Sequence, residues 1–147
     1  MKAVVQRVSR CRVTVNGQVI SEIGKGMLVL LAVGTLDGER QARWMADKIP
    51  GLRIFSDENE RMNLSLLEIG AAMVVVSQFT LYGDCRKGRR PSYSAAAPAS
   101  QALSLYHIFC NLVRQKGVNV AEGAFGTHMQ VELVNDGPVT LIVESPE

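Results

Sequence analysis

Uninterrupted and alternating runs of apolar residues divide the chain into predicted strands. Residues 27–33 (MLVLLAV) and 73–76 (MVVV) are apolar at every position, which is typical of strands covered on both faces. Residues 1–15 alternate Val with Arg and Gln, and Asn16-Gly17 supplies the two central residues of a tight turn. We therefore expect residues 18–23 to return beside the first strand as a hairpin.

Two stretches carry apolar residues at helical spacing instead. The first runs to Ile49 from Asp37, a residue type that caps helix N-termini, and Pro50-Gly51 follows it. The second runs from Ser100 to Lys116 and is followed by a glycine, with an apolar stripe wide enough to imply burial. The sequence thus predicts two main helices.

Shorter segments complete the predicted sheet. Further strands are expected at residues 52–55, 71–81, 118–121, 129–134 and 139–143, whereas residues 64–69 fit either a strand or a helix. The charged segment 56–61 and the small-residue segment 92–100 should lie on the surface. With roughly seven to nine strands and two helices, the pattern predicts one α/β domain, residues 1–147, in which helices cover a mostly antiparallel or mixed sheet.

Composition narrows the class of protein. No apolar segment of the 147 residues is long enough to span a membrane, and the N-terminus has no signal-peptide pattern, so we expect a soluble cytoplasmic protein. The three cysteines are widely spaced and form no C-x-x-C pair, which fits a reducing compartment. The formal net charge is only +2, so any contact with nucleic acid should be local.

The usual arrangements of catalytic side chains are absent. His107 and His128 belong to no H-x-x-x-H or H-x-H pattern, and the sequence has no G-x-S-x-G, phosphate-loop or dinucleotide fingerprint. We therefore expect no metal and no cofactor. His107 lies within a predicted helix, where a structural role is the simpler interpretation, and Cys85 has no neighbouring His to activate it.

One candidate site follows the buried strand at residues 73–76. Ser77, Gln78 and Thr80 come directly after its apolar run, so their polar groups are either paired structurally or presented to a ligand. A cluster of four cations comes next, formed by Arg86, Lys87, Arg89 and Arg90. This cluster is either a solvated loop or a binding surface for an anionic ligand.

A second candidate site interrupts the last predicted strand pair. Asn135-Asp136-Gly137-Pro138 can be interpreted as an ordinary hairpin turn. However, Pro138 cannot donate a hydrogen bond to a strand ladder, and an X-Pro bond is where a cis peptide is accessible. The turn is therefore also a candidate functional element.

Both candidate sites resemble the signature motifs of one family. Ser77-Gln78-Phe79-Thr80-Leu81 and Asn135-Asp136-Gly137-Pro138-Val139-Thr140 are similar to those of the D-aminoacyl-tRNA deacylases, as are the segments KAVVQRVSRCRVTV and YGDCRKGRRPSY. The resemblance implies a homodimer with layered α/β/β structure and a curved, barrel-like mixed sheet. It also implies hydrolysis of the ester that joins a D-amino acid, or glycine, to the 3′ end of tRNA.

The resemblance assigns roles to these residues. It implies that a cis Gly137-Pro138 pair of one subunit enters the pocket of the other and rejects L-aminoacyl groups, while Ser77, Gln78, Phe79 and Thr80 form the catalytic segment. Backbone amides and the 2′-hydroxyl of the terminal adenosine would assist a water molecule. Two alternatives stay open: Thr80 as a covalent nucleophile, and an RNA-binding module without catalysis.

Overall fold

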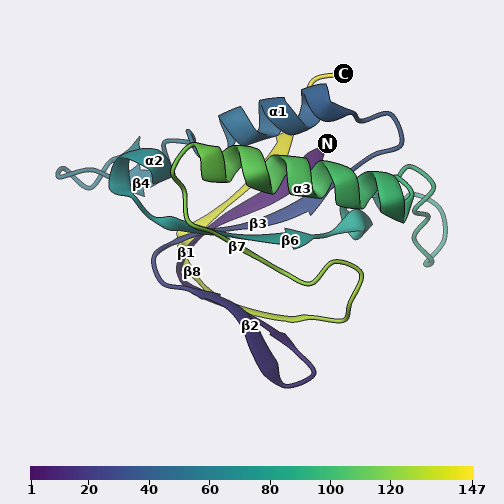
Figure 1. Ribbon diagram of the computed structural model, residues 1–147, viewed down its shortest axis with the longest axis horizontal. Coiled ribbons are helices and arrows are strands. Elements are labelled where there is room, and N and C mark those ends of the chain that lie inside the picture. The colour runs from purple at the N-terminus through teal and green to yellow at the C-terminus, as the bar shows by residue number, and fades with distance from the viewer.

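The computed structural model describes all residues 1–147, and its centre is a mixed six-stranded sheet (Figure 1). The strands are ordered β2-β1-β3-β6-β7, and β8 pairs with the other edge of β1. Pairs that involve β1 are antiparallel, whereas β3, β6 and β7 are parallel to one another. The strands are β1 (Lys2–Val15), β2 (Gln18–Ile23), β3 (Gly26–Ala32), β6 (Ala72–Ser77), β7 (Val120–Glu122) and β8 (Gln130–Glu144).

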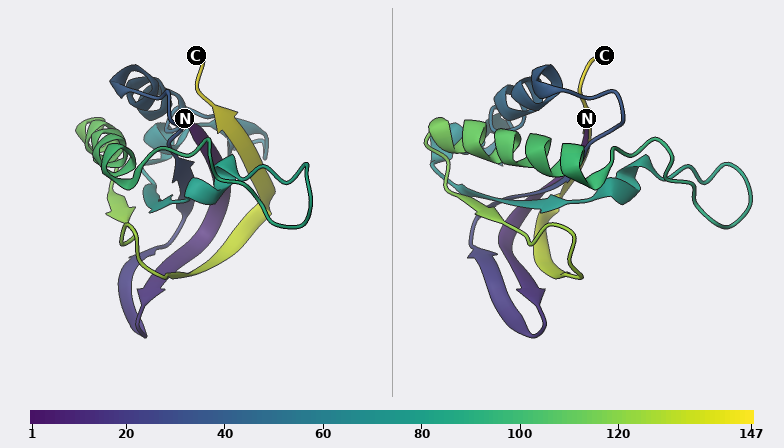
Figure 2. Two further views of the ribbon diagram at one scale, coloured as in Figure 1. Left: turned by 90° about the vertical axis from the view of Figure 1, so that its right-hand side faces the viewer. Right: turned by 45° about the vertical axis from the view of Figure 1, so that its right-hand side comes forward.

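The length of β1 makes the sheet curve. Its first half pairs with β3 and its second half with β2, while β8 follows it along the opposite edge. The sheet therefore curls into a nearly closed, barrel-like form (Figure 2). The inside of the curl is a separate apolar cluster that includes Val8, Leu28 and Val74.

Two helices cover the other face of the sheet. α1 (Glu39–Lys48) and α3 (Ala99–Gln115) lie side by side above β3 and β6 (Figure 1). Their buried residues, Met45 and Phe109 among them, form the main core with Val29 and Val75 of the sheet. The predicted α/β/β layering with two main helices is confirmed.

The structure corrects several predicted boundaries. The strand expected over residues 71–81 ends at Ser77, and a short 3-10 helix, η1 (Phe79–Tyr82), follows it. Residues 64–69 contain the short helix α2 (Leu66–Ile69), which begins at a capping box of Ser65 and Glu68. The strand expected over residues 52–55 is reduced to β4 (Phe55–Ser56), which pairs with β5 (Met62–Leu64).

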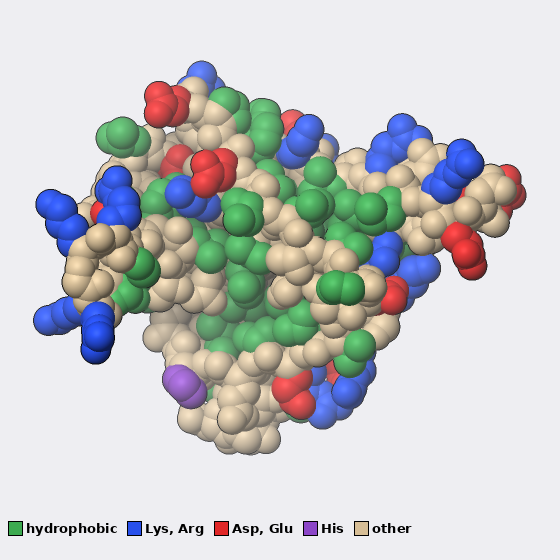
Figure 3. Space-filling view, turned by 180° about the vertical axis from the view of Figure 1, so that it is seen from behind, with side chains coloured by type: hydrophobic (Ala, Val, Ile, Leu, Met, Phe, Trp, Pro, Cys, Tyr) green, Lys and Arg blue, Asp and Glu red, His purple; other side chains and the backbone are tan.

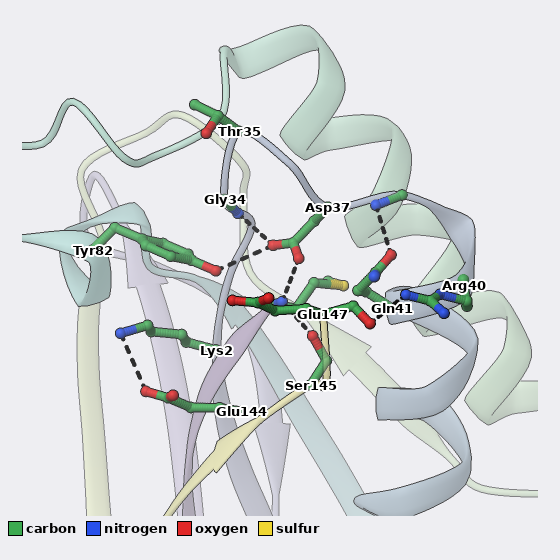
Figure 4. Close-up of polar contacts among 12 residues, drawn as sticks. Lys2, Gly34, Thr35, Asp37, Arg40, Gln41, Tyr82, Glu144, Ser145 and Glu147 are labelled. Carbon is green, nitrogen blue, oxygen red and sulfur yellow. Dashed lines mark hydrogen bonds and ion pairs between the residues drawn. The ribbon is translucent and has the colours of Figure 1, made fainter.

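Asp37 does not cap α1, which contradicts the prediction. Gly38 occupies the N-cap position, and the Gln41 side chain accepts a hydrogen bond from its amide. The Asp37 carboxylate instead binds the nearby Gly34 amide and two groups that are distant in sequence, the Met1 amino group and the Tyr82 hydroxyl (Figure 4). Tertiary contacts have therefore overridden a local capping preference.

The interpretation of residues 135–138 as a hairpin turn is wrong. Both halves of β8 pair with β1 in the same antiparallel direction, so the strand continues past this segment. Val8 pairs with Asn135 and Gln6 with Thr140, which leaves residues 136–139 opposite Arg7 alone. The segment is therefore a bulge that projects from one long strand.

No helix of the protein is long and apolar enough to cross a membrane. The three cysteines are free, with Cys11 and Cys110 buried and Cys85 exposed.

Candidate active site

A largely apolar pocket of about 250 Å³ lies where β3 and β6 end, beside the start of α3. Because parallel strands bring their carboxyl ends to the same edge, Leu31–Val33 and Ser77–Phe79 meet there. The remaining lining comes from Ala97, Ala99, Ala102, Tyr106, Phe125 and Gly126. The predicted Ser77, Gln78 and Phe79 therefore line a cavity suited to a small organic group.

The turn after β6 presents free backbone donors. The Gln78 amide donates to the Leu31 carbonyl at 2.8 Å, which ends the ladder between β3 and β6. The next two amides, of Phe79 and Thr80, begin η1 and have no hydrogen-bond partner within the protein. Two adjacent N–H groups are thus available to bind an acceptor such as an ester carbonyl.

Thr80 lacks a base. Its hydroxyl accepts a hydrogen bond from the Gln78 side-chain amide, which cannot take a proton from it. His107, on the exposed side of α3, lies beside Glu122 instead, with Nδ1 at 3.7 Å from the carboxylate. The contacts of Thr80 favour a role in orientation rather than nucleophilic attack.

The floor of the pocket comes from residues that carried no signal in the sequence. Tyr106 is buried, donates its hydroxyl to the Val75 carbonyl at 2.8 Å and lies 6.0 Å from the Phe125 ring. Phe125 and Gly126 lie in a turn after β7 (Val120–Glu122), and residues 92–100 were expected only to lie on the surface. This segment also contributes Ala97, whose amide binds the Val33 carbonyl at 2.9 Å.

The predicted cation cluster lies on a loop that projects from the body (Figures 1 and 3). A bridge between Asp84 and Ser92 closes its base, and the Tyr93 ring lies 5.2 Å from Phe79. Arg86 is held by Asp84 at 2.6 Å, and this contact lowers the pKa of the Asp84 carboxyl well below its usual range. Lys87, Arg89 and Arg90 are exposed and make no ion pair, so their charges face solvent.

Side-chain contacts hold the bulge in β8. The Asn135 side chain accepts from the Val139 amide at 2.7 Å and donates to the Val139 carbonyl at 3.1 Å, so it closes the neck. Arg7 donates from Nε to the Asp136 carbonyl at 2.7 Å. The Gly137-Pro138 bond is cis, and both residues are exposed.

Within one chain, the bulge and the pocket do not meet. Arg7, opposite the bulge, pairs with Met27 at the start of β3, whereas the pocket is lined by Leu31–Val33 at its end. From Met27 to Ala32 the strand advances by five residues, which is about 17 Å at 3.3–3.4 Å per residue. β1 and β3 also lie between β8 and β6. The two candidate sites are therefore separate in the monomer.

No three His, Cys, Asp or Glu side chains lie close enough together to hold a metal ion. The chemistry available at the pocket is that of backbone amides and neutral polar side chains.

Comparison with known proteins gives this geometry a context. The family model described as D-Tyr-tRNA(Tyr) deacylase matches residues 4–144. The chain belongs to the D-aminoacyl-tRNA deacylase family. It is 58% identical to the D-aminoacyl-tRNA deacylase of Desulfatibacillum aliphaticivorans, over 99% of each chain. The relative of the same name from Clostridioides difficile (strain 630) is 56% identical over 99% of this chain and 97% of its own.

Solved structures agree on the fold. A structure named c-Myc DNA Unwinding Element Binding Protein superimposes with a TM-score of 0.93 at 41% identity, over the full length of both chains. A structure described as a probable eukaryotic D-amino acid tRNA deacylase has a TM-score of 0.83 at 20% identity and covers 97% of each chain. The names of the family model and of these relatives describe deacylases, which are enzymes.

Proposed function

We propose that this protein, as one domain of residues 1–147, hydrolyses D-aminoacyl-tRNA and glycyl-tRNA and rejects L-aminoacyl-tRNA. The observation that carries the proposal is a pair of unpartnered amides, one of Phe79, which lines a small pocket without a side-chain base, and one of the next residue, Thr80, which lies outside the lining. Membership of the deacylase family supports the substrate class. The proposed compartment is the cytoplasm, which fits three free cysteines.

In the proposed mechanism, the ester carbonyl accepts hydrogen bonds from the two amides. These donors stabilise the negative charge that develops on the carbonyl oxygen as water attacks. The Gln78 side chain holds the Thr80 hydroxyl, so Thr80 shapes the turn and a water molecule is the nucleophile. The 2′-hydroxyl of the terminal adenosine is the group nearest the ester in the substrate, and we assign it an assisting role.

Chiral selection requires a second subunit in this proposal. Gly137-Pro138 is remote from Ser77–Thr80 in its own chain, so the bulge must come from a partner to act at the pocket. β8 pairs only with β1 and exposes Val134, Leu141 and Ile142, the last with 76% of its surface accessible. Figure 3 shows apolar side chains gathered on the face that is hidden from view in Figure 1. An exposed apolar strand edge of this kind supports a homodimer.

A backbone wall selects by exclusion. If the amino group and the ester carbonyl are both held, the D and L side chains point in different directions, and Gly137-Pro138 can block the L direction by steric contact alone. Glycine has no side chain to exclude, so glycyl-tRNA is also a substrate. The exposed Lys87, Arg89 and Arg90 would bind phosphates of the tRNA 3′ end.

The direct test measures ester loss from matched D-aminoacyl-, L-aminoacyl- and glycyl-tRNA. Gly137→Ala should then lower the D-to-L rate ratio by roughly tenfold or more, because a displaced wall no longer fits. A Cβ at Gly137 would lie 2.6 Å from the Val139 amide nitrogen, at a φ of +155°. Gly24→Ala is the matched control, because a Cβ there meets no atom within 4 Å. An unaltered ratio in Gly137→Ala would contradict the proposed wall.

Subunit mixing tests the shared site. Ala102→Trp should fill the pocket, and Gly137→Ala should damage the wall. A mixed dimer of the two variants contains one site with an intact pocket and an intact partner bulge, so it should regain chiral selectivity. If the rates of a mixture on D- and L-aminoacyl-tRNA equal the sum of the rates of the two separate variants, the bulge does not act across an interface.

The name of the neighbour at 41% identity supports a second candidate, in which the chain binds nucleic acid without hydrolysing an ester. Multiple turnovers on D-aminoacyl-tRNA would exclude this candidate, whereas saturable binding with no ester loss would favour it.

A further inference from the structure

The turn that carries the free amides is fastened at its far end by a side chain. η1 begins with Phe79 and ends with Tyr82, whose hydroxyl lies 3.1 Å from Oδ2 of Asp37. The close-up in Figure 4 shows the Tyr82 side chain directed toward the segment of Gly34 and Asp37. The orientation of η1 thus depends on a contact 45 residues away in sequence.

Asp37 is itself held firmly. Its Oδ2 also accepts the Gly34 amide at 2.6 Å, and its Oδ1 lies 2.6 Å from the Met1 amino group. Only 12% of its side chain is exposed, so these donors replace most of its hydration. A carboxylate that binds three donors, one from its own segment and two from distant parts of the chain, has one orientation and gives Tyr82 a fixed partner.

The same segment forms the opposite wall of the pocket. Val33 lines the cavity and binds the Ala97 amide, and the neighbouring Gly34 lies against Tyr82 so closely that a Cβ would be 2.7 Å from the hydroxyl oxygen. The Tyr82 to Asp37 hydrogen bond therefore joins the wall that holds Val33 to the turn that holds Phe79. It fixes the width of the pocket between them.

Two further features keep the Tyr82 side chain in place and its hydroxyl protonated. The Lys2 ammonium lies 5.2 Å from the centre of the Tyr82 ring, and Lys2 is itself paired with Glu144 at 3.1 Å. Burial and the neighbouring Asp37 carboxylate raise the pKa of the Tyr82 phenol, so it remains a hydrogen-bond donor at physiological pH.

We propose that Tyr82 and Asp37 are positioning residues for ester hydrolysis, which set the amides of Phe79 and Thr80 at the correct distance from the far wall of the pocket. This inference rests on the proposed function. Neither residue touches substrate. Their hydrogen bond acts through the backbone of η1.

The test compares Tyr82→Phe with the unmodified protein in steady-state kinetics with D-aminoacyl-tRNA. This substitution removes only the hydroxyl, so the variant should fold while kcat falls between about tenfold and 100-fold and KM changes little, as expected for displaced reacting groups. Asp37→Asn should lower kcat in the same range. Because the two residues act through one contact, the double variant should be no slower than the slower single variant.

A stability control separates positioning from folding. Ser65→Ala removes the N-cap of α2, which does not line the pocket, so it should lower the melting temperature and leave kcat unchanged. A Tyr82→Phe variant with full kcat would overturn the proposal. A double variant whose loss in kcat is the product of the losses in Tyr82→Phe and Asp37→Asn would overturn it as well. If the unmodified protein itself fails to cleave D-aminoacyl-tRNA, the proposed function is what fails.

Discussion

The exposed loop of cations makes a quantitative prediction about tRNA binding. Arg89 and Arg90 have no acidic partner, whereas Arg86 is held by Asp84. If Arg89 and Arg90 each contact one phosphate of the single-stranded 3′ end, each contributes about 0.7 to the slope of log K against log salt. The double variant Arg89→Ala/Arg90→Ala should therefore reduce this slope by about 1.4.

The same reasoning gives a change in affinity. Between about 50 and 200 mM salt, two such contacts account for roughly sevenfold of the loss in binding, and this part should vanish in the double variant. The assay is fluorescence anisotropy with labelled uncharged tRNA across that salt range. The rate at saturating substrate should be unchanged, because the loop does not line the pocket.

A control variant must carry the same change in net charge. Arg43→Ala/Arg61→Ala removes two exposed cations, one from α1 and one from the loop between β4 and β5. That loop lies at the opposite end of the molecule from the cation cluster (Figure 1). An unaltered slope in the Arg89/Arg90 variant, or an equal change in the control, would refute binding through this loop.

Four further results are expected. Thr80→Ala should retain measurable hydrolysis, and an aminoacyl ester trapped on Thr80 would contradict this expectation. Hydrolysis should also survive exhaustive chelation, since the structure has no cluster of metal ligands. Native protein should expose one thiol, Cys85, to a disulfide-exchange reagent, and a second thiol reacting at the same rate would be inconsistent with the burial of the others. Burial raises the pKa of the Cys11 thiol from 9.0 to about 11. The contribution of this thiol to the free energy of unfolding is therefore complete below pH 9 and is lost as the pH rises toward 11. Burial also raises the pKa of Cys110, to about 12, so the free energy of unfolding from denaturant titrations should fall in Cys11→Ala as well, but by about 2–3 kcal/mol less than in the unmodified protein.

The hydrophobic pattern along the chain predicts those elements in which each face is either buried or exposed along its whole length. β3 and β6 were predictable because both faces are covered, so Met27–Ala32 and Ala72–Val76 are apolar at every position. α1 and α3 were predictable because each buries one stripe. In these elements the period of the sequence matches the geometry of burial.

Long-range contacts set the limits of prediction. β8 resembles a hairpin locally, and only its partner β1, at the other end of the chain, reveals that it is a single bulged strand. Asp37 resembles a helix cap, yet its carboxylate accepts hydrogen bonds from Met1 and Tyr82, which are 36 and 45 residues away. The pocket draws its walls from segments near residues 32, 78, 97 and 125, which no local window includes together.

The candidate chemistry also explains why the sequence offers so few catalytic side chains. The groups that would act on the ester are backbone amides of Phe79 and Thr80, and the element that would exclude an L side chain is the backbone around Gly137. Backbone groups are the same in every residue, so sequence reveals them only through residues that constrain the chain. Gly137 meets this condition, because a Cβ at its position would collide with Val139. Phe79 does not, because its amide is free only where β6 ends and η1 begins, and that boundary depends on the tertiary structure.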